Sequence, residues 1–165
     1  MSNDNLISQE LLHEIFEYRD GHLYWKNPKA KNVKSDSKAG SVKDTGYLRV
    51  GLFGKHFRVH RLIYLMFHGY VPKILDHING NKLDNRIENL RPATSSQNNS
   101  NSVKQKRNTS GIKNVYWNKN IKKWTVIIGV DKKLKYFGSY NSIEEAAEVA
   151  KQKRNELHKE FARHE

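Results

Sequence analysis

The chain has 165 residues, 36% of them hydrophobic, and a formal net charge of +13. This length suits one medium domain or two small ones, and no apolar run approaches the ~20 residues that span a bilayer. The absence of cysteine excludes disulfides, thiolate nucleophiles and Cys-containing zinc sites, and we expect no secretory signal and a cytoplasmic location. The excess of positive charge predicts a polyanionic partner, with nucleic acid first and no membrane.

The first 70 residues predict a small mixed domain. Ser8 can cap a first helix, Gly54 marks a hairpin between alternating apolar and polar residues, and Gly69 is a helix stop. The expected elements are a helix over 8–18, a strand over 21–26, a loop over 27–46, a hairpin over 47–60 and a helix over 61–69.

The segment 74–98 carries the unusual chemistry. Asp76 and His77 are adjacent and follow the apolar pair Ile74-Leu75, which predicts a strand that ends in a turn. A second strand from Leu90 and a short helix with Asn98 follow. Phosphodiester hydrolysis needs a base that works near neutral pH, which histidine supplies. It also needs a hard cation with oxygen ligands, which Asp76 and Asn98 can provide.

The stretch DHINGNKLDNRIENLR resembles the signature of HNH endonucleases of the phage and intron-encoded homing type. GHLYWK, GYLRV and VHRL resemble the N-terminal part of the same family. The resemblance implies that His77 is the general base, that Asp76 and Asn98 bind the metal, and that Asn89 holds the loop and orients the base. The metal would be Mg²⁺, with Mn²⁺ as the alternative, and Asn99 is the neighbouring alternative to Asn98.

Three further side chains are candidates for phosphate contact beside the active site. The resemblance suggests that His60 and Arg61 lie near the catalytic phosphate, and a polar cap on a buried helix is the alternative role for both. Arg86 contacts a phosphate or pairs with Asp84 or Glu88; the sequence does not separate these two roles.

A basic linker separates the nuclease segment from the C-terminal part. Residues 104–135 hold ten basic side chains and one acid, whereas residues 142–165 are nearly balanced. This division predicts one strongly positive face that meets DNA. We place the nuclease domain at 1–100, the linker at 101–110 and the C-terminal domain at 111–165. DNA contacts are expected from the linker residues Lys104, Lys106 and Arg107.

Residues 109–162 resemble an AP2 domain, a three-stranded antiparallel sheet packed on one helix. Strands are expected over 114–117, 123–130 and 133–140, with a helix from Ser142 in a capping box with Glu145. Alternation along 123–130 places Trp124, Val126, Ile128 and Val130 against the helix. The opposite face would enter the DNA major groove. Its expected DNA contacts are Lys113, Tyr116, Asn118, Thr125, Ile127 and Tyr136.

The sequence therefore predicts an α+β protein with an HNH nuclease domain and an AP2-like DNA-binding domain. The expected activity is site-specific, metal-dependent cleavage or nicking of double-stranded DNA by a monomer without a small-molecule cofactor. A phage-encoded protein acting in the bacterial host is the expected source. Two alternatives remain: a non-catalytic DNA-binding regulator on a degenerate nuclease scaffold, and a protein that binds RNA through exposed aromatic residues.

Overall fold

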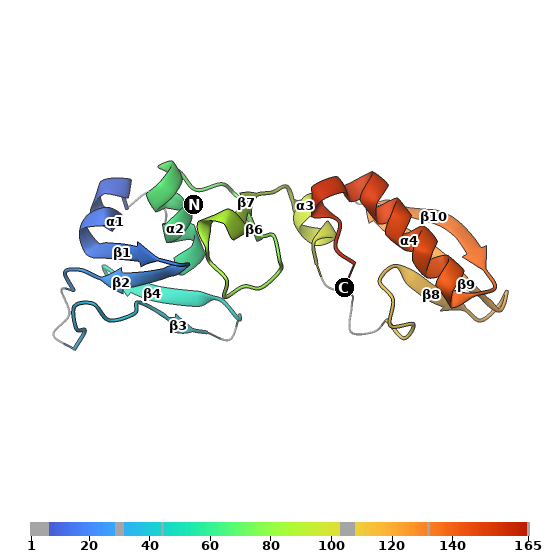
Figure 1. The fold of residues 1–165 in the computed structure, drawn as a ribbon, viewed down its shortest axis with the longest axis horizontal. Helices are drawn as coiled ribbons and strands as arrows, with labels where there is room; N and C mark the ends of the chain where they lie inside the picture. Colours follow the sequence, from blue (N-terminus) through green and yellow to red (C-terminus); the bar gives the residue numbers. More distant parts are fainter. Residues whose placement is uncertain (1–6, 29–31, 44, 103–107, 132, 165) are drawn as a thin grey trace. The chain divides into compact units, whose positions relative to one another are not determined.

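The computed structural model describes residues 7–28, 32–43, 45–102, 108–131 and 133–164. The chain divides into two compact units, Met1–Pro92 and Ala93–Glu165. Both units combine helices with strands (Figure 1), which confirms the predicted mixed class. Among the described residues, no helix has the length and apolar character needed to cross a membrane.

The first unit contains three small antiparallel strand groups beside two helices. Strand β1 pairs with β2, strands β3, β4 and β5 form a sheet in that order, and β6 pairs with β7. In chain order, the elements are α1 (Gln9–Ile15), β1 (Phe16–Arg19), β2 (His22–Trp25), β3 (Ser41–Val42), β4 (Leu48–Leu52), β5 (Lys55–Arg58), α2 (Val59–His68), β6 (Leu75–His77), η2 (Ile87–Asn89) and β7 (Leu90–Pro92).

Helix α1 is shorter than predicted. It begins after the Ser8 cap but ends at Ile15, and the next four residues form strand β1. The reason is the turn at Asp20-Gly21, where φ is 43° and 78°. Asp-Gly with both residues at positive φ favours a two-residue hairpin. This turn pairs β1 with β2, and the predicted helix over 16–18 is wrong.

Helix α2 forms the centre of the first core. It follows β5 directly and ends at Gly69, which has a φ of 73° as a left-handed cap. Its apolar residues pack with those of α1, β2, β4 and β5 in one buried cluster. The Gln9 side chain also donates to the Met66 carbonyl at 2.7 Å, which ties α1 to α2. The core thus supports the start of α2 and the strands next to it.

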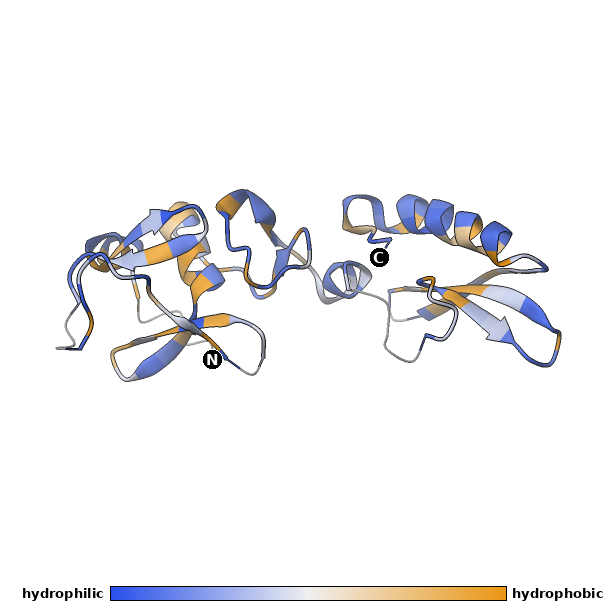
Figure 2. Cartoon of the chain, turned by 60° about the horizontal axis from the view of Figure 1, so that its bottom comes forward, coloured by the Kyte–Doolittle hydropathy of each residue, from blue (hydrophilic) through white to orange (hydrophobic). Residues whose placement is uncertain are grey.

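The second unit contains a three-stranded antiparallel sheet and one long helix. The strands lie in the order β10-β9-β8. The elements are α3 (Ser95–Ser100), β8 (Val115–Asn118), β9 (Lys123–Val130), β10 (Lys133–Tyr140), α4 (Ile143–His158) and η3 (Lys159–Phe161). Helix α4 is mostly hydrophilic with separate apolar bands (Figure 2), as expected for a helix that buries one side.

Alternation along β9 assigns its inner face as predicted. Val126 and Ile128 are buried with Ala146 and Ala150 of α4, and Trp124 packs at the edge of the same cluster. The small alanine side chains let the helix lie close to the sheet. Ser142 caps α4 by accepting from the amides of residues 144 and 145.

Helix α3 lies in the second unit, although its residues fall within the predicted nuclease domain of residues 1–100. Thr94 and Gln97 form a capping box at its start. At its end, the Lys113 ammonium donates to the carbonyls of Ser100 and Ser102 at 2.8 and 2.6 Å. These contacts, which a linear boundary prediction does not detect, attach α3 to the second unit.

Candidate active site

Strands β6 and β7 carry the two residues at the centre of the predicted site. The strands pair antiparallel, with Asp76 opposite Arg91 and His77 opposite Leu90. His77 ends β6, and the chain then enters the loop 78–89. Both Asp76 and His77 are buried, and His77 is only 4% exposed. Adjacent strand residues point to opposite faces, so the two side chains meet different neighbours.

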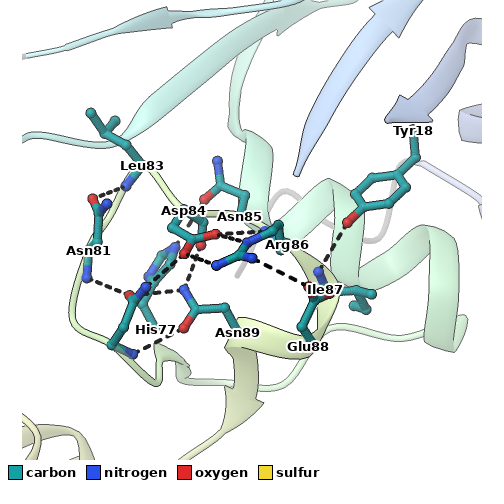
Figure 3. Close-up of polar contacts among 11 residues, drawn as sticks. Tyr18, His77, Asn81, Leu83, Asp84, Asn85, Arg86, Ile87, Glu88 and Asn89 are labelled. Atoms are coloured by element: carbon teal, nitrogen blue, oxygen red, sulfur yellow. Dashed lines mark hydrogen bonds and ion pairs between the residues drawn. The ribbon is translucent and has the colours of Figure 1, made fainter. Parts of the chain in front are cut away.

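The His77 ring is contacted by Asn85 from the loop. Asn85 Oδ1 lies 3.0 Å from His77 Nε2, and Asn85 is fully buried at 1% exposure (Figure 3). When Nε2 donates to this oxygen, the neutral ring carries its proton there, and Nδ1 has the lone pair that accepts a proton. Sequence reasoning missed Asn85, because the loop offers several amides and no spacing that distinguishes this one.

A second histidine lies against the first. The ring centroids of His60 and His77 are 4.9 Å apart, and the Tyr47 ring lies 5.1 Å from His60 and 6.1 Å from His77. Burial lowers the pKa of His60 to about 3, with the charges of His77, Arg58 and Arg61 acting in the same direction. His60 is therefore a neutral, packed neighbour of the predicted base at every physiological pH.

The pKa of His77 is also below its ordinary value. Burial is the largest cause, and the positive charge of Lys82 adds to it. The Asn85 hydrogen bond and the Asp76 and Asp84 charges oppose this shift. The imidazole is therefore neutral near pH 7, as a general base must be.

Asn89 closes the loop by bonding across its base. Its Oδ1 accepts from the Asn79 amide at 3.0 Å, and its Nδ2 donates to Asn79 Oδ1 at 3.0 Å and to the Asp84 carbonyl at 2.7 Å. These contacts match the predicted loop-holding role in position. The direct contact to His77 Nε2 comes from Asn85 instead, so any effect of Asn89 on the base passes through the loop.

The two predicted arginine contacts are engaged with protein groups. Arg86 donates to both carboxylate oxygens of Asp84, each at 2.8 Å (Figure 3). This pair holds the pKa of Asp84 well below its usual range. Arg61 donates to the Pro72 carbonyl at 3.1 Å. Of the two roles that the sequence leaves open for Arg86, the structure contains the ion pair with Asp84.

Comparison with known proteins identifies the region around this site. The HNH endonuclease family profile matches residues 57–100, from β5 through α3. Protein 3.8 of Escherichia phage T7 is 35% identical over 113 residues, which cover 67% of this chain and 93% of that protein. An uncharacterized HNH endonuclease of Acanthamoeba polyphaga mimivirus is 38% identical over 77 residues, 41% of this chain and 19% of that protein.

Residues 57–100 thus form a segment of the HNH endonuclease family, and the chain as a whole is related to protein 3.8 of phage T7. This match suggests a nuclease, and HNH endonucleases act on DNA, generally with a divalent metal. The chain spans about a fifth of the mimivirus relative. No solved structure matches the chain significantly.

The buried carboxylate of this site is an oxygen donor of the kind that a hard cation prefers. Asp76 offers a buried carboxylate, whose Oδ2 accepts from Arg91 Nε at 3.1 Å. Among the described residues, no group of three or more His, Cys, Asp or Glu side chains could hold a metal. A single carboxylate suits a cation that keeps several waters and phosphate oxygens as ligands. The predicted amide ligand, Asn98, lies on α3 in the second unit.

The predicted DNA contacts of the second unit differ in exposure. Tyr136 is 64% exposed, Tyr116 is also exposed, and Ile127 is half-buried on the sheet face away from α4. Asn118 accepts from the amide of Asn120 at 3.0 Å and so stabilises the turn after β8. The AP2 resemblance itself stays a prediction.

Two of the residues predicted to contact DNA are buried. Lys113 is buried and donates to carbonyls after α3, and burial lowers its pKa to about 8. Thr125 is buried beside Ser139, with the two hydroxyl oxygens 3.1 Å apart. Neighbouring hydroxyl and carbonyl groups occupy the polar atoms of both residues, and a direct DNA contact by either one stays a prediction. The predicted contacts Lys104, Lys106 and Arg107 lie outside the described residues.

Proposed function

We propose that this HNH protein is a site-specific, metal-dependent DNA endonuclease of the homing type that nicks double-stranded DNA as a monomer. The observation that carries the proposal is the neutral, buried His77 with Asn85 Oδ1 at its Nε2, next in sequence to the carboxylate of Asp76. Within a matched HNH segment, this pair combines a proton acceptor and an anionic metal ligand.

In the proposed reaction, His77 Nδ1 takes a proton from the attacking water. The new P–O bond forms as the bond from phosphorus to the 3′ oxygen breaks. The released 3′ oxygen takes a proton from solvent water, which leaves a 5′-phosphate and a 3′-hydroxyl as the family resemblance implies. Asn85 keeps the proton of the resting ring on Nε2, and Asn89 keeps the loop closed. A divalent metal such as Mg²⁺, held by Asp76 and Asn98, would neutralise charge on the phosphate.

The second unit would select the DNA sequence. Its Tyr116 and Tyr136 side chains are exposed, and lysines lie on the same strand as Tyr136, which suits contact with bases and phosphates. The same aromatic residues are what RNA binding would require. Competition between DNA and RNA duplexes of the same sequence separates these two possibilities. The phage relative supports a phage-encoded protein that acts in the cytoplasm of its host.

The first experiment is nicking of supercoiled plasmids by the purified chain in Mg²⁺, with EDTA as a control. The plasmids carry a library of random inserts, so that a site-specific enzyme meets its site. His77→Ala should abolish nicking, because general base catalysis typically contributes about 10²- to 10⁴-fold. Equal nicking by wild type and His77→Ala would remove the catalytic assignment, and a wild type that binds DNA without cutting favours the regulator.

A matched pair of variants tests which amide side chain binds the metal. Asn98→Ala should remove metal-dependent nicking, whereas Asn99→Ala should retain it. The reverse result would move the ligand to Asn99.

A further inference from the structure

Two cations share one aromatic ring beside the active site. The Arg58 guanidinium carbon lies 4.6 Å from the centre of the Tyr47 ring, and Lys82 Nζ lies 4.7 Å from it. Cations at these distances are attracted by the negative face of an aromatic ring. Lys82 also donates to the Thr45 carbonyl at 3.1 Å, so its position is fixed at two points. We call Tyr47, Arg58 and Lys82 the Tyr47 cluster.

The two cations of the Tyr47 cluster have no carboxylate partner within the part of the chain that the structure describes. Three other guanidinium groups of this unit do have one: Arg19 pairs with Glu17, Arg86 with Asp84 and Arg91 with Asp76. Arg58 and Lys82 are both exposed. Placing two uncompensated positive charges on one ring has an electrostatic cost, which bound anionic oxygens would reduce.

The Tyr47 cluster adjoins the predicted base. Its ring packs against His60 and lies 6.1 Å from the His77 ring. Arg58 is also the residue that precedes helix α2, where no side chain caps the helix and the first turn holds no acid. The positive end of the helix dipole therefore adds to the charge of the cations.

From this geometry we infer that Tyr47, Arg58 and Lys82 form a phosphate-binding site for the DNA strand next to the scissile bond. The inference rests on the proposed nuclease function. Arg58 would donate to phosphate oxygens through its planar fork, and Lys82 through ammonium protons that Thr45 leaves available. Tyr47 would hold both cations in place without neutralising them. Arg61 and Arg86, the cations that the sequence suggests, already have protein partners.

The test measures DNA binding by the full chain without cleavage. A fluorescent 20-base-pair duplex of arbitrary sequence is titrated in EDTA at several salt concentrations. Arg58→Gln and Lys82→Gln should each weaken binding and reduce the slope of log K against log salt by about 0.9, the value for one lost phosphate contact. Lys55→Gln is the matched control, because Lys55 is an exposed cation at the other end of the same strand.

The Tyr47 ring has its own pair of variants. Tyr47→Phe keeps the ring and should bind like wild type, whereas Tyr47→Leu should lose affinity because the cations are no longer held. Equal slopes for wild type, Arg58→Gln and Lys82→Gln would overturn the inference, and so would the same loss in Lys55→Gln. Thermal melting by circular dichroism confirms that each variant is folded.

Nicking in Mg²⁺ separates this inference from the proposed function. If wild type nicks DNA and the Arg58 and Lys82 variants bind with an unchanged slope, the phosphate site is wrong and the nuclease stands. If wild type does not nick DNA while each variant reduces the salt slope by the value of about one phosphate contact, the phosphate-binding site is supported and the nuclease function is not.

Discussion

At the scale of single residues, the catalytic prediction depends on which His77 nitrogen carries the proton. Asn85 reaches Nε2 from inside the loop and is itself buried. The Asn85 Nδ2 is buried without a hydrogen-bond partner among the described residues. A buried amide with an unsatisfied donor costs free energy, and its retention beside the base suggests that its oxygen serves His77.

Replacing Asn85 should change the tautomer of His77. In Asn85→Leu, the Nε2 proton loses its acceptor, so the fraction of rings with the proton on Nδ1 should rise and kcat should fall. A fall of about 10- to 100-fold is typical when a residue that orients a functional histidine is removed. The measurement combines plasmid nicking with the ¹⁵N chemical shifts of His77, which report the tautomer without any activity.

Asn81, another asparagine of the same loop, provides the control for the Asn85→Leu variant. Asn81 is exposed and accepts from the Leu83 amide at 3.1 Å (Figure 3), so Asn81→Leu should leave the His77 shifts unchanged. If wild-type His77 already carries its proton on Nδ1, the Asn85 amide is oriented the other way and the assigned base nitrogen is wrong.

At the scale of elements, the turn between β1 and β2 supports the catalytic loop. A Cβ at Gly21 would lie 2.7 Å from the Arg86 amide nitrogen and 3.1 Å from the Asn85 carbonyl carbon. The Tyr18 hydroxyl also accepts from the Ile87 amide at 3.2 Å, which fixes β1 against the same loop. The β1–β2 hairpin, which replaces part of the predicted helix, thus positions the loop whose Asn85 contacts His77.

Gly21→Ala should therefore damage both stability and activity. The positive φ of 78° alone costs about 1–2 kcal/mol for an L side chain. The collision with the Arg86 and Asn85 backbone adds an overpacking cost of about 1–3 kcal/mol. Denaturant unfolding measures the free energy of unfolding, and plasmid nicking measures the displacement of the loop.

Gly54 provides the matched comparison for Gly21. Its φ is 73°, and a Cβ there would meet nothing within 4 Å. Gly54→Ala should show only the cost of backbone strain and keep its nicking rate. Equal losses in the two variants would show that the close approach at Gly21 does not matter.

At the scale of the whole molecule, burial of neutral histidines should make stability depend on pH. Burial is the first cause of a lowered pKa at five of the eight histidines, in both units. These residues are His22, His60, His77, His158 and His164. Each must take up a proton on unfolding in acid, because the unfolded pKa is about 6.5.

Stability should fall as the pH drops below about 6.5. Above that value these histidines are neutral in both states and the stabilising term is fully present. Below it the unfolded chain binds protons that the folded chain does not. For His60, with a folded pKa of about 3, each pH unit in this window costs up to about 1.4 kcal/mol. Urea unfolding from pH 7.5 to 4.5 measures the slope.

His60→Gln should reduce that slope, because the largest single contribution is removed, even if the variant is less stable at pH 7.5. His68→Gln is the control, since His68 lies at the end of the same helix and is exposed. An unchanged pH slope in His60→Gln would contradict the assignment of a buried neutral imidazole at this position.

Local patterns in the sequence are enough to predict most of the elements and the family. Ser8, Gly54, Gly69 and Ser142 mark turns and helix ends correctly, since capping and positive φ depend on a few neighbouring residues. The alternation along β9 identifies its buried face, because the side-chain period of a strand is local. The segment DHINGNKLDNRIENLR indicates the HNH family, because the motif is contiguous in the chain.

The meeting of polar side chains in the site follows from tertiary structure alone. Asn85 and Lys82 come from the loop that follows His77, whereas Tyr47 and Arg58 come from a distant part of the chain, and no spacing in the sequence marks these four residues. Lys113, a predicted DNA contact, is likewise buried in the folded chain, where its ammonium donates to the carbonyls of Ser100 and Ser102. Hydrogen bonds, ring contacts and desolvation depend on distances between segments far apart in the chain, which residue order does not specify.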